Sequence, residues 1–150
     1  MLHFLGIGAQ KSGTTWLYEL LSQHPQVRFP AQKEVHFWDR EDLCELPWYQ
    51  SLFADGSGSD VRHGEITPSY ATLRRERVAV IHSHFPALRL LYIIRNPIDR
   101  AWSSALMALA RAEMAVEEAS DEWFIDHFRS QGSLRRGGYL SCIRTWESIY

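Results

Sequence analysis

The sequence has few cysteines, no long hydrophobic run and no basic leader. Its two cysteines, Cys44 and Cys142, lie far apart, so neither a disulfide framework nor a zinc site is expected. No apolar stretch approaches the roughly 18 residues that a transmembrane helix requires. Residues 1–10 lack the charge and the apolar length of a signal peptide. We therefore expect a soluble, reduced, cytoplasmic protein without a membrane span.

Net charge and lysine are also scarce. The 150-residue chain carries a formal net charge of −2, so a protein that binds nucleic acid is not expected. Its length and its 45% hydrophobic content fit one globular domain over residues 1–150. Fourteen basic residues are arginines, and the two lysines are Lys11 and Lys33. Both lysines fall within motifs described below, where a compact point charge has a specific use.

The first 25 residues predict a strand, a tight turn and a helix. Residues 3–8 form an apolar run typical of a buried strand, and the polar residues 9–13 follow it. Apolar residues then recur at helical spacing: Trp16, Leu17, Leu20 and Leu21. Pro25 ends this helical segment.

Later segments continue the alternation of strands and helices. Short strands are expected near 27–29 and 61–65, and the uniformly apolar residues 90–94 predict a strand at the centre of a parallel sheet. Helices are expected at about 74–84, from Pro97 onward, at 121–128 with Asp121 as N-cap, and near the C-terminus. The alternation predicts an α/β fold, a P-loop-like parallel sheet flanked by helices.

Two of these helices carry an apolar stripe. The stripe that follows Pro97 consists of Ile98, Ala101, Trp102, Ala105, Leu106 and Leu109. The stripe of the last helix consists of Leu140, Ile143, Trp146 and Ile149. No later segment of this sequence covers the last stripe, so we expect an exposed face through which the chain can self-associate.

A glycine-containing turn, Gly8-Ala-Gln-Lys-Ser-Gly-Thr-Thr15, joins the first strand to the first helix. Unpaired N–H groups at a helix N-terminus favour an anion, and Gly13 allows an anion to approach the backbone closely. Thr14 and Thr15 add hydroxyl donors, and Lys11 adds a positive charge. The Walker A pattern is not intact, because Thr14 stands where its lysine belongs. The turn predicts a phosphate site, and the alternative is an ordinary capped helix.

A second motif surrounds Arg95, at the carboxyl end of the strand predicted for 90–94. Ligands of open α/β sheets bind at that end, and an arginine there can bind a phosphate with two hydrogen bonds. Ser103 follows eight residues later, about two helical turns into the next helix. The alternative is an arginine that forms a salt bridge with Asp99 or another carboxylate.

A third motif is Lys33-Glu-Val-His-Phe-Trp38, which places a carboxylate near an imidazole. Glu34 or His36 can act as a general base when its surroundings shift its pKa suitably. The alternative is a surface turn with ordinary charges.

The motifs together resemble one known family. In chain order they read Lys-Ser-Gly-Thr-Thr-Trp-Leu, Lys-Glu-Val-His-Phe, Gly-Glu-Ile-Thr-Pro-Ser-Tyr and Arg-Asn-Pro-Ile-Asp-Arg-Ala-Trp-Ser. This order resembles the sulfotransferases that use 3′-phosphoadenosine 5′-phosphosulfate (PAPS). The resemblance is greatest to the branch that contains the heparan sulfate sulfotransferases and their bacterial relatives, and it extends over nearly the whole chain.

The resemblance implies how PAPS is bound as co-substrate. The loop for its 5′-phosphosulfate corresponds to Lys11, Ser12, Gly13, Thr14 and Thr15. The site for its 3′-phosphate corresponds to Arg95 and Ser103.

The resemblance also implies the chemistry. Lys11 is expected to stabilise the leaving phosphate, and Glu34 to accept the acceptor's proton, with His36 as the other candidate base. The reaction is then an in-line transfer of a sulfuryl group to a hydroxyl or amine, without a metal. The acceptor is expected to be a saccharide, a glycolipid or a small hydroxylated metabolite.

Two features depart from this family. The segment from Gly64 to Tyr70 resembles a substrate-side segment, but Ile66 stands where heparan-type enzymes often place a lysine. The family's domain is also longer, and residues 136–146 resemble a stretch from its middle. We therefore expect 1–150 to be the N-terminal, donor-binding portion of a sulfotransferase domain whose C-terminal part is missing.

Two other functions remain open at this point. A truncated, non-catalytic remnant could bind nucleotide or serve as an interaction module. A P-loop kinase is disfavoured by the displaced lysine and by the lack of an apolar strand that ends in aspartate.

Overall fold

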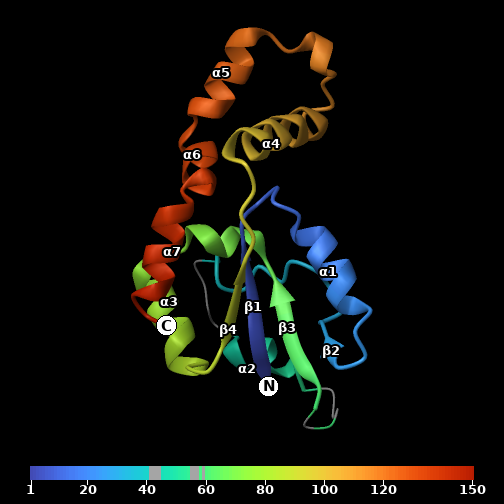
Figure 1. Ribbon diagram of the computed structural model, residues 1–150, viewed down its shortest axis with the longest axis vertical. Helices are drawn as coiled ribbons and strands as arrows, with labels where there is room; N and C mark the ends of the chain where they lie inside the picture. The colour runs from blue at the N-terminus through green and yellow to red at the C-terminus, as the bar shows by residue number, and fades with distance from the viewer. Residues whose placement is uncertain (41–44, 55–57, 59) are drawn as a thin grey trace.

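The computed structural model describes residues 1–40, 45–54, 58 and 60–150, so Cys44 lies outside the described residues. In this part of the chain, the strands form one parallel sheet in the order β2-β3-β1-β4 (Figure 1). Its strands are β1 (Leu2–Gly8), β2 (Val27–Arg28), β3 (Arg62–Ile66) and β4 (Arg89–Tyr92). The predicted α/β fold is confirmed.

Strand β4 lies at the edge of the described sheet, whereas β1 lies inside it between β3 and β4. The expectation that the apolar run at 90–94 forms a central strand is therefore wrong. Leu90, Leu91 and Tyr92 are only half-buried, and the side chain of Ile94, beyond the strand, is 60% exposed. Composition alone did not distinguish an edge strand partly covered by a helix from a strand enclosed on both sides.

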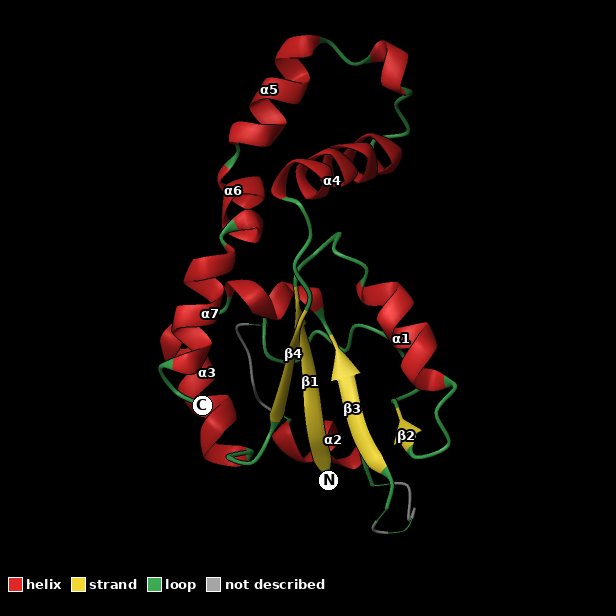
Figure 2. Cartoon of the chain, viewed as in Figure 1, coloured by secondary structure: helices red, strands yellow, loops and turns green. Residues whose placement is uncertain are grey.

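The helices lie in the order that the sequence predicts, with additions (Figure 2). They are α1 (Thr14–Ser22), α2 (Leu46–Ser51), α3 (Arg75–His84), α4 (Pro97–Arg111), α5 (Asp121–Arg129), α6 (Gln131–Gly137) and α7 (Tyr139–Glu147). Two 3₁₀ segments, η1 (Pro68–Thr72) and η2 (Val116–Glu118), complete the elements of the described residues. Helices α3 and α7 flank the β4 edge, α1 lies by β3, and α4 to α6 lie beyond the carboxyl ends of the strands (Figure 1).

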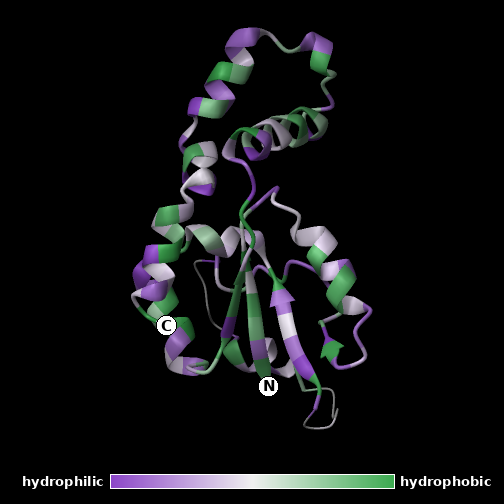
Figure 3. Ribbon diagram, in the orientation of Figure 1, coloured by the Kyte–Doolittle hydropathy of each residue, from purple (hydrophilic) through white to green (hydrophobic). Residues whose placement is uncertain are grey.

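The core is rich in aromatic side chains between the sheet and the helices that flank it. Trp38, Tyr49 and Phe53 are each at most 1% exposed. The rings of Phe37 and Tyr49 stack with centroids 4.4 Å apart, and Trp38 meets Tyr49 edge to face at 5.3 Å. Figure 3 shows hydrophobic residues along β1 and β4 and mixed hydropathy on α5 to α7. This packing holds Phe37 and Trp38 in the main core beside the sheet.

The predicted apolar stripe of α4 is only partly buried. Ala105 and Leu109 are buried, but Ile98 is 78% exposed and Trp102 is 46% exposed. The reason is that α4 packs against α5 and α6 rather than on the sheet, and Trp102 stacks on Phe124 of α5 with centroids 5.1 Å apart. The predicted stripe of α1 is similar, because Trp16 and Leu20 are exposed.

Helix α7 corrects the expectation of an uncovered C-terminal face. Trp146 is 2% exposed and Cys142 is 5% exposed, and both belong to the main core. The hydroxyl of Tyr150 also donates to the carbonyl of Phe85, 3.1 Å away. Only Leu140 of the predicted stripe is largely exposed. Self-association through that stripe stays a prediction.

Two smaller findings concern helix ends and length. Ser120, rather than Asp121, is the N-cap of α5, because its side chain accepts the backbone N–H of Trp123. Asp121 occupies the first helical position, where its charge favours the N-terminal end of the helix dipole. Among the described residues, no helix is both long enough and apolar enough to cross a membrane.

Candidate functional site

The turn between β1 and α1 lies at the carboxyl end of the parallel sheet (Figure 1). Gly13 precedes the helix with φ 97° and ψ 18°, a left-handed conformation that suits glycine. No described side chain caps α1, so the N–H groups of its first turn remain available to an anion. Lys11 also has a left-handed backbone, with φ 66°. The local structure is therefore an open turn without a side-chain cap, and its role as a phosphate site stays a prediction.

Arg95 reaches this turn from the end of β4. The backbones of β1 and β4 continue to pair here, since Ile93 and Gly8 share a hydrogen bond of 2.8 Å. A guanidinium N–H of Arg95 donates to the carbonyl of Lys11, 3.3 Å away, and the hydroxyl of Tyr139 donates to the carbonyl of Arg95. Among the described residues, no carboxylate forms an ion pair with Arg95. The alternative of a salt bridge with Asp99 is therefore wrong.

One pocket of about 340 Å³ brings the predicted motifs together. It is lined by Gln10, Lys11, Gly13, Thr14, Thr15, Glu34, Pro68, Arg95, Ser103, Met107 and Arg111. These include every predicted site residue except Ser12 and His36. The buried Ser12 has a hydroxyl with no hydrogen-bond partner among the described residues. His36 does not line the pocket, and its Nε2 contacts a carboxylate oxygen of Glu34.

Arg111 is a pocket residue that the sequence reasoning missed. Ser103, Met107 and Arg111 are spaced four residues apart on α4 and therefore share one helix face. The four-residue spacing from Ser103 is the sequence signal from which Arg111 could have been predicted. With Lys11 and Arg95, Arg111 gives the pocket three cationic side chains around the single carboxylate of Glu34. The pocket is therefore suited to an anionic ligand.

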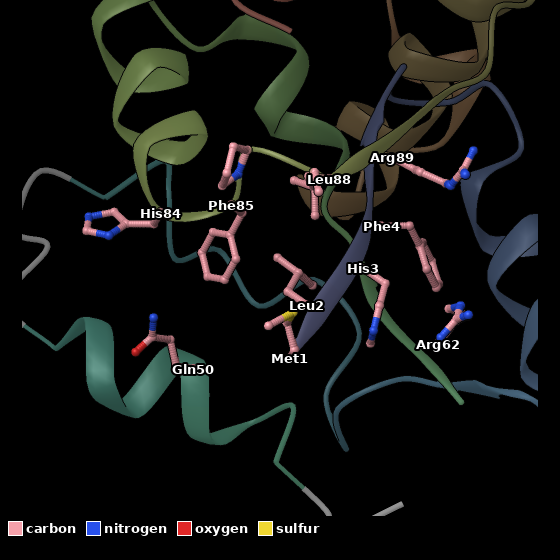
Figure 4. A pocket seen from close by; sticks show the side chains of 12 residues that line it. Met1, Leu2, His3, Phe4, Gln50, Arg62, His84, Phe85, Leu88 and Arg89 are labelled. Carbon is pink, nitrogen blue, oxygen red and sulfur yellow. The ribbon is translucent and has the colours of Figure 1, made fainter. Parts of the chain in front are cut away.

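A larger and mostly apolar pocket of about 590 Å³ lies elsewhere (Figure 4). It opens where β1 and β4 begin, between Met1, Phe85 and Leu88. None of the predicted site residues lines it. Because parallel sheets bind ligands at the carboxyl ends of their strands, the smaller polar pocket is the candidate site.

The third motif forms a chain of charged groups beside the pocket. One carboxylate oxygen of Glu34 lies 3.2 Å from Nζ of Lys33, and the other lies 3.2 Å from Nε2 of His36. Nδ1 of His36 lies 2.7 Å from Oδ2 of Asp39, which also accepts the hydroxyl of Ser69. These groups therefore form one connected network at a partly exposed position, and the general-base role of Glu34 or His36 stays a prediction.

The network shifts the pKa of two of its members. Partial burial opposes the charged form of His36, but the hydrogen bond and negative charge of Asp39 outweigh it and raise the pKa of His36. Burial likewise acts against ionised Asp39, but Ser69 and His36 outweigh it and lower the pKa of Asp39. Both shifts favour the charged forms of the pair, and in its imidazolium form His36 donates to a carboxylate from each ring nitrogen.

The segment 64–70 does not place all its side chains toward a substrate. Glu65, Thr67 and Tyr70 are at most 1% exposed and belong to the interior, as does Ile66. Pro68 lines the candidate pocket, and Ser69 binds Asp39. The chain therefore uses most of this segment internally, and its role on the substrate side stays a prediction.

Charged side chains in the described residues do not gather as a metal site. No three histidine, cysteine, aspartate or glutamate side chains of this part of the chain are arranged to hold a metal ion together.

Known proteins are similar to this chain in sequence and in fold. The sulfotransferase domain family matches residues 3–150. Human heparan sulfate glucosamine 3-O-sulfotransferase 6 is 37% identical over 105 residues, which cover 70% of this chain and 30% of the relative. Mouse heparan sulfate glucosamine 3-O-sulfotransferase 3B1 is 35% identical over 105 residues, covering 70% and 26%. Membrane-associated sulfotransferase kil1 of Dictyostelium discoideum is 27% identical over 103 residues, covering 67% and 22%.

A solved structure gives the corresponding comparison of folds. A sulfotransferase from Alicyclobacillus acidocaldarius superposes with a TM-score of 0.75 at 24% identity, covering 100% of this chain and 69% of that protein. The two proteins share a fold. The chain spans less than a third of the length of the curated relatives named above.

Proposed function

The chain belongs to the sulfotransferase domain family, and from this premise we propose that it transfers a sulfuryl group from PAPS to a saccharide-type acceptor. The observation that carries the proposal is the single pocket shared by the α1 turn, Arg95 and Glu34. A donor site and a candidate base on one pocket wall are what an in-line group transfer requires. In this proposal residues 1–150 supply the donor-binding portion of the domain.

The donor side of the pocket is matched to two separate phosphate groups. Lys11 and the free N–H groups of the first turn of α1 form one anionic subsite, which we assign to the 5′-phosphosulfate. Arg95 and Ser103 form the other, which we assign to the 3′-phosphate, with Arg111 on the same helix face as Ser103. Because the Arg95 guanidinium has no ion-pair partner among the described residues, a phosphate meets no competing carboxylate there.

Glu34 is the base that the geometry favours over His36. His36 lies between the carboxylates of Glu34 and Asp39, so both of its ring nitrogens already have acceptors to bind. Neither ring nitrogen of His36 is therefore left without a partner to act as a base. Glu34 lines the pocket itself. Contacts of its carboxylate with Lys33 and His36 keep the carboxylate oriented.

The proposed sulfuryl transfer forms one bond to sulfur and breaks another. The acceptor oxygen or nitrogen forms a bond to sulfur while the bond between sulfur and the bridging phosphate oxygen breaks. Glu34 takes the acceptor's proton, and Lys11 with the turn's N–H groups stabilises the charge that develops on the leaving phosphate. The reaction therefore needs positioned charges, which this pocket supplies.

The acceptor class is the part of the proposal that the relatives' names support. Two of the relatives are named for glucosamine in heparan sulfate. We propose a saccharide acceptor, joined through a hydroxyl or an amine. Ile66 is 1% exposed, so the residue at this position does not contact an acceptor on the surface.

Calorimetric titration tests the donor site. We expect 3′-phosphoadenosine 5′-phosphate to bind the chain at least about tenfold more tightly than 5′-AMP, because a phosphate bound by an arginine contributes well over 1 kcal/mol. Magnesium-dependent preference for ATP contradicts the proposal and favours a kinase. Binding of none of the three nucleotides by the folded chain contradicts a donor site and favours a non-catalytic remnant. Sulfation of heparan sulfate by labelled PAPS then tests transfer.

A further inference from the structure

The segment that carries Glu34 has no regular secondary structure of its own. Residues 33–37 belong to neither a helix nor a strand, and Glu34 and His36 both have left-handed backbones, with φ 64° and 53°. Such conformations are unfavourable for residues with a side chain, so they persist only where the surroundings impose them. The backbone of this segment is therefore held by contacts from elsewhere in the chain.

Alternate side chains of the segment face opposite ways. Glu34 and His36 are partly exposed beside the pocket, whereas Val35, Phe37 and Trp38 are buried at 7%, 4% and 1% exposure. The backbone N–H groups of Phe37 and Trp38 point toward the interior. Buried N–H groups require acceptors, and this segment has no ladder or helix to supply them.

A buried side chain of η1, Tyr70, supplies this acceptor. The hydroxyl oxygen of Tyr70 accepts the N–H of Phe37 at 3.0 Å and lies 3.4 Å from the backbone nitrogen of Trp38. Tyr70 thus binds the backbone directly after His36, three residues from Glu34.

Glu65 itself is held by several donors. Its Oε1 accepts the hydroxyls of Tyr49 and Tyr70, and its Oε2 accepts the hydroxyl of Thr67 at 2.8 Å. The residue is 1% exposed, and among the described residues it has no ion-pair partner. Both oxygens act only as acceptors here, which a carboxylate can do and an amide cannot. Burial raises the pKa of Glu65, and the hydrogen bonds it accepts oppose this rise.

We propose that Tyr70, whose hydroxyl is oriented by Glu65, is a positioning residue that holds Glu34 in its catalytic conformation through the backbone N–H of Phe37. This inference rests on the proposed function, since it assigns the base to Glu34. It extends that function by naming what fixes the base, which lies on an irregular segment. Preorganisation of a base in this way supports turnover rather than donor binding.

Tyr49 provides a matched control for Tyr70. Both tyrosines are 0% exposed, and both donate to Oε1 of Glu65. Only the hydroxyl of Tyr70 also accepts the segment's N–H groups. Tyr70→Phe and Tyr49→Phe therefore remove equivalent buried hydroxyls, and they differ in whether the segment loses its acceptor.

Amide hydrogen exchange tests the backbone contact without any assay of activity. In Tyr70→Phe we expect the protection of the Phe37 amide to fall by about tenfold relative to the global unfolding limit, and in Tyr49→Phe to stay within about twofold. Equal loss of protection in the two variants overturns the proposal, because it indicates a general loss of stability. If Tyr70→Phe does not fold, Glu65→Gln, which changes the acceptor of the Tyr70 hydroxyl, is measured instead with the same Phe37 amide as the reporter.

Kinetics then separate positioning from donor binding. With labelled PAPS and heparan sulfate, we expect Tyr70→Phe to lower kcat by about tenfold or more while the Kd for 3′-phosphoadenosine 5′-phosphate stays within about twofold. An unchanged kcat overturns the proposal. If the unsubstituted chain transfers no sulfuryl group, the proposed function fails by itself, and the exchange result still decides whether Tyr70 holds the segment.

Discussion

Nε2 of His36 lies 3.2 Å from one carboxylate oxygen of Glu34, while Lys33 lies 3.2 Å from the other. Both oxygens of the candidate base are thus bound by a cationic or potentially cationic neighbour, and the base cannot rotate freely. The hydroxyl of Thr15 lies 3.4 Å from the same Lys33 ammonium. Lys33 therefore contacts both the carboxylate of Glu34 and the start of α1.

The first prediction concerns the base. Glu34→Gln keeps the size of the side chain but removes the carboxylate that accepts a proton. We expect kcat for sulfation of heparan sulfate to fall by about 10²- to 10⁴-fold, with little change in the Kd for 3′-phosphoadenosine 5′-phosphate. Glu19→Gln, an exposed substitution on α1, serves as the control. Retention of full activity by Glu34→Gln removes Glu34 from the mechanism.

The second prediction concerns the pH dependence of stability. The pKa of His36 is raised above 6.5 and that of Asp39 is lowered below 3.8. The contribution of His36 is therefore present below pH 6.5 and is lost as pH rises through its raised pKa. The contribution of Asp39 is present above pH 3.8 and is lost as pH falls through its lowered pKa.

Urea unfolding of the unsubstituted chain and of Asp39→Asn measures this contribution. We expect the unsubstituted chain to be more stable than the variant in mildly acidic buffer, between those two limits. The difference in unfolding free energy should shrink in alkaline buffer, where His36 is neutral. A difference that stays constant across this range rules out the ion pair as its source.

The third prediction uses the left-handed backbone of Lys11. Because φ is 66° at this residue, Lys11→Gly relieves an unfavourable conformation while it removes the charge. We expect the thermal midpoint to be retained and the turnover to fall by about 10²- to 10³-fold. Glu113→Gly is the control, since φ is 53° there and Glu113 does not line the pocket. Equal activities of the two variants would falsify a role for Lys11.

The fourth prediction concerns the 3′-phosphate. Arg95→Ala should reduce the affinity for 3′-phosphoadenosine 5′-phosphate by about ten- to hundredfold and leave that for 5′-AMP nearly unchanged. Arg89→Ala removes an exposed arginine from the other end of β4 and should change neither affinity. Calorimetry on both variants decides the matter, and a parallel loss for both nucleotides places the 3′-phosphate elsewhere.

The fifth prediction concerns the last helix. Trp146 is 2% exposed, so Trp146→Ala should lower the free energy of unfolding by about 3–5 kcal/mol. Leu140, on the same helix, is 58% exposed, and Leu140→Ala should change it by less than about 0.5 kcal/mol. Similar effects of the two substitutions on urea unfolding contradict the docking of α7 on the core.

Much of the candidate site could be predicted because it lies in local patterns. A strand, a glycine turn and a helix in succession place Lys11 and Gly13 at the carboxyl end of the sheet, whatever the remaining chain does. The residues near Arg95 repeat that arrangement at the end of the next apolar segment. Arg111 was not predicted, although it lies eight residues after Ser103 and therefore on the same face of α4.

Other features could not be predicted from local patterns. An apolar segment such as 90–94 indicates burial, but its neighbours in the sheet depend on pairings between distant residues, and here β4 pairs with β1 alone among the described strands. The burial of Glu65 is similar. A carboxylate in a sequence indicates a surface by default, and only the convergence of Tyr49, Thr67 and Tyr70 makes its burial tolerable.

The sequence by itself therefore determined the fold class, the family and the residues of the turn before α1, because these follow from periodicity and from short motifs along the chain. Tertiary structure alone decided the strand order, the docking of α7 and the partners of the candidate base. Those features arise from contacts between segments that are far apart in the sequence. The 3.0 Å contact between the Phe37 amide and the Tyr70 hydroxyl, 33 residues apart, is one of them.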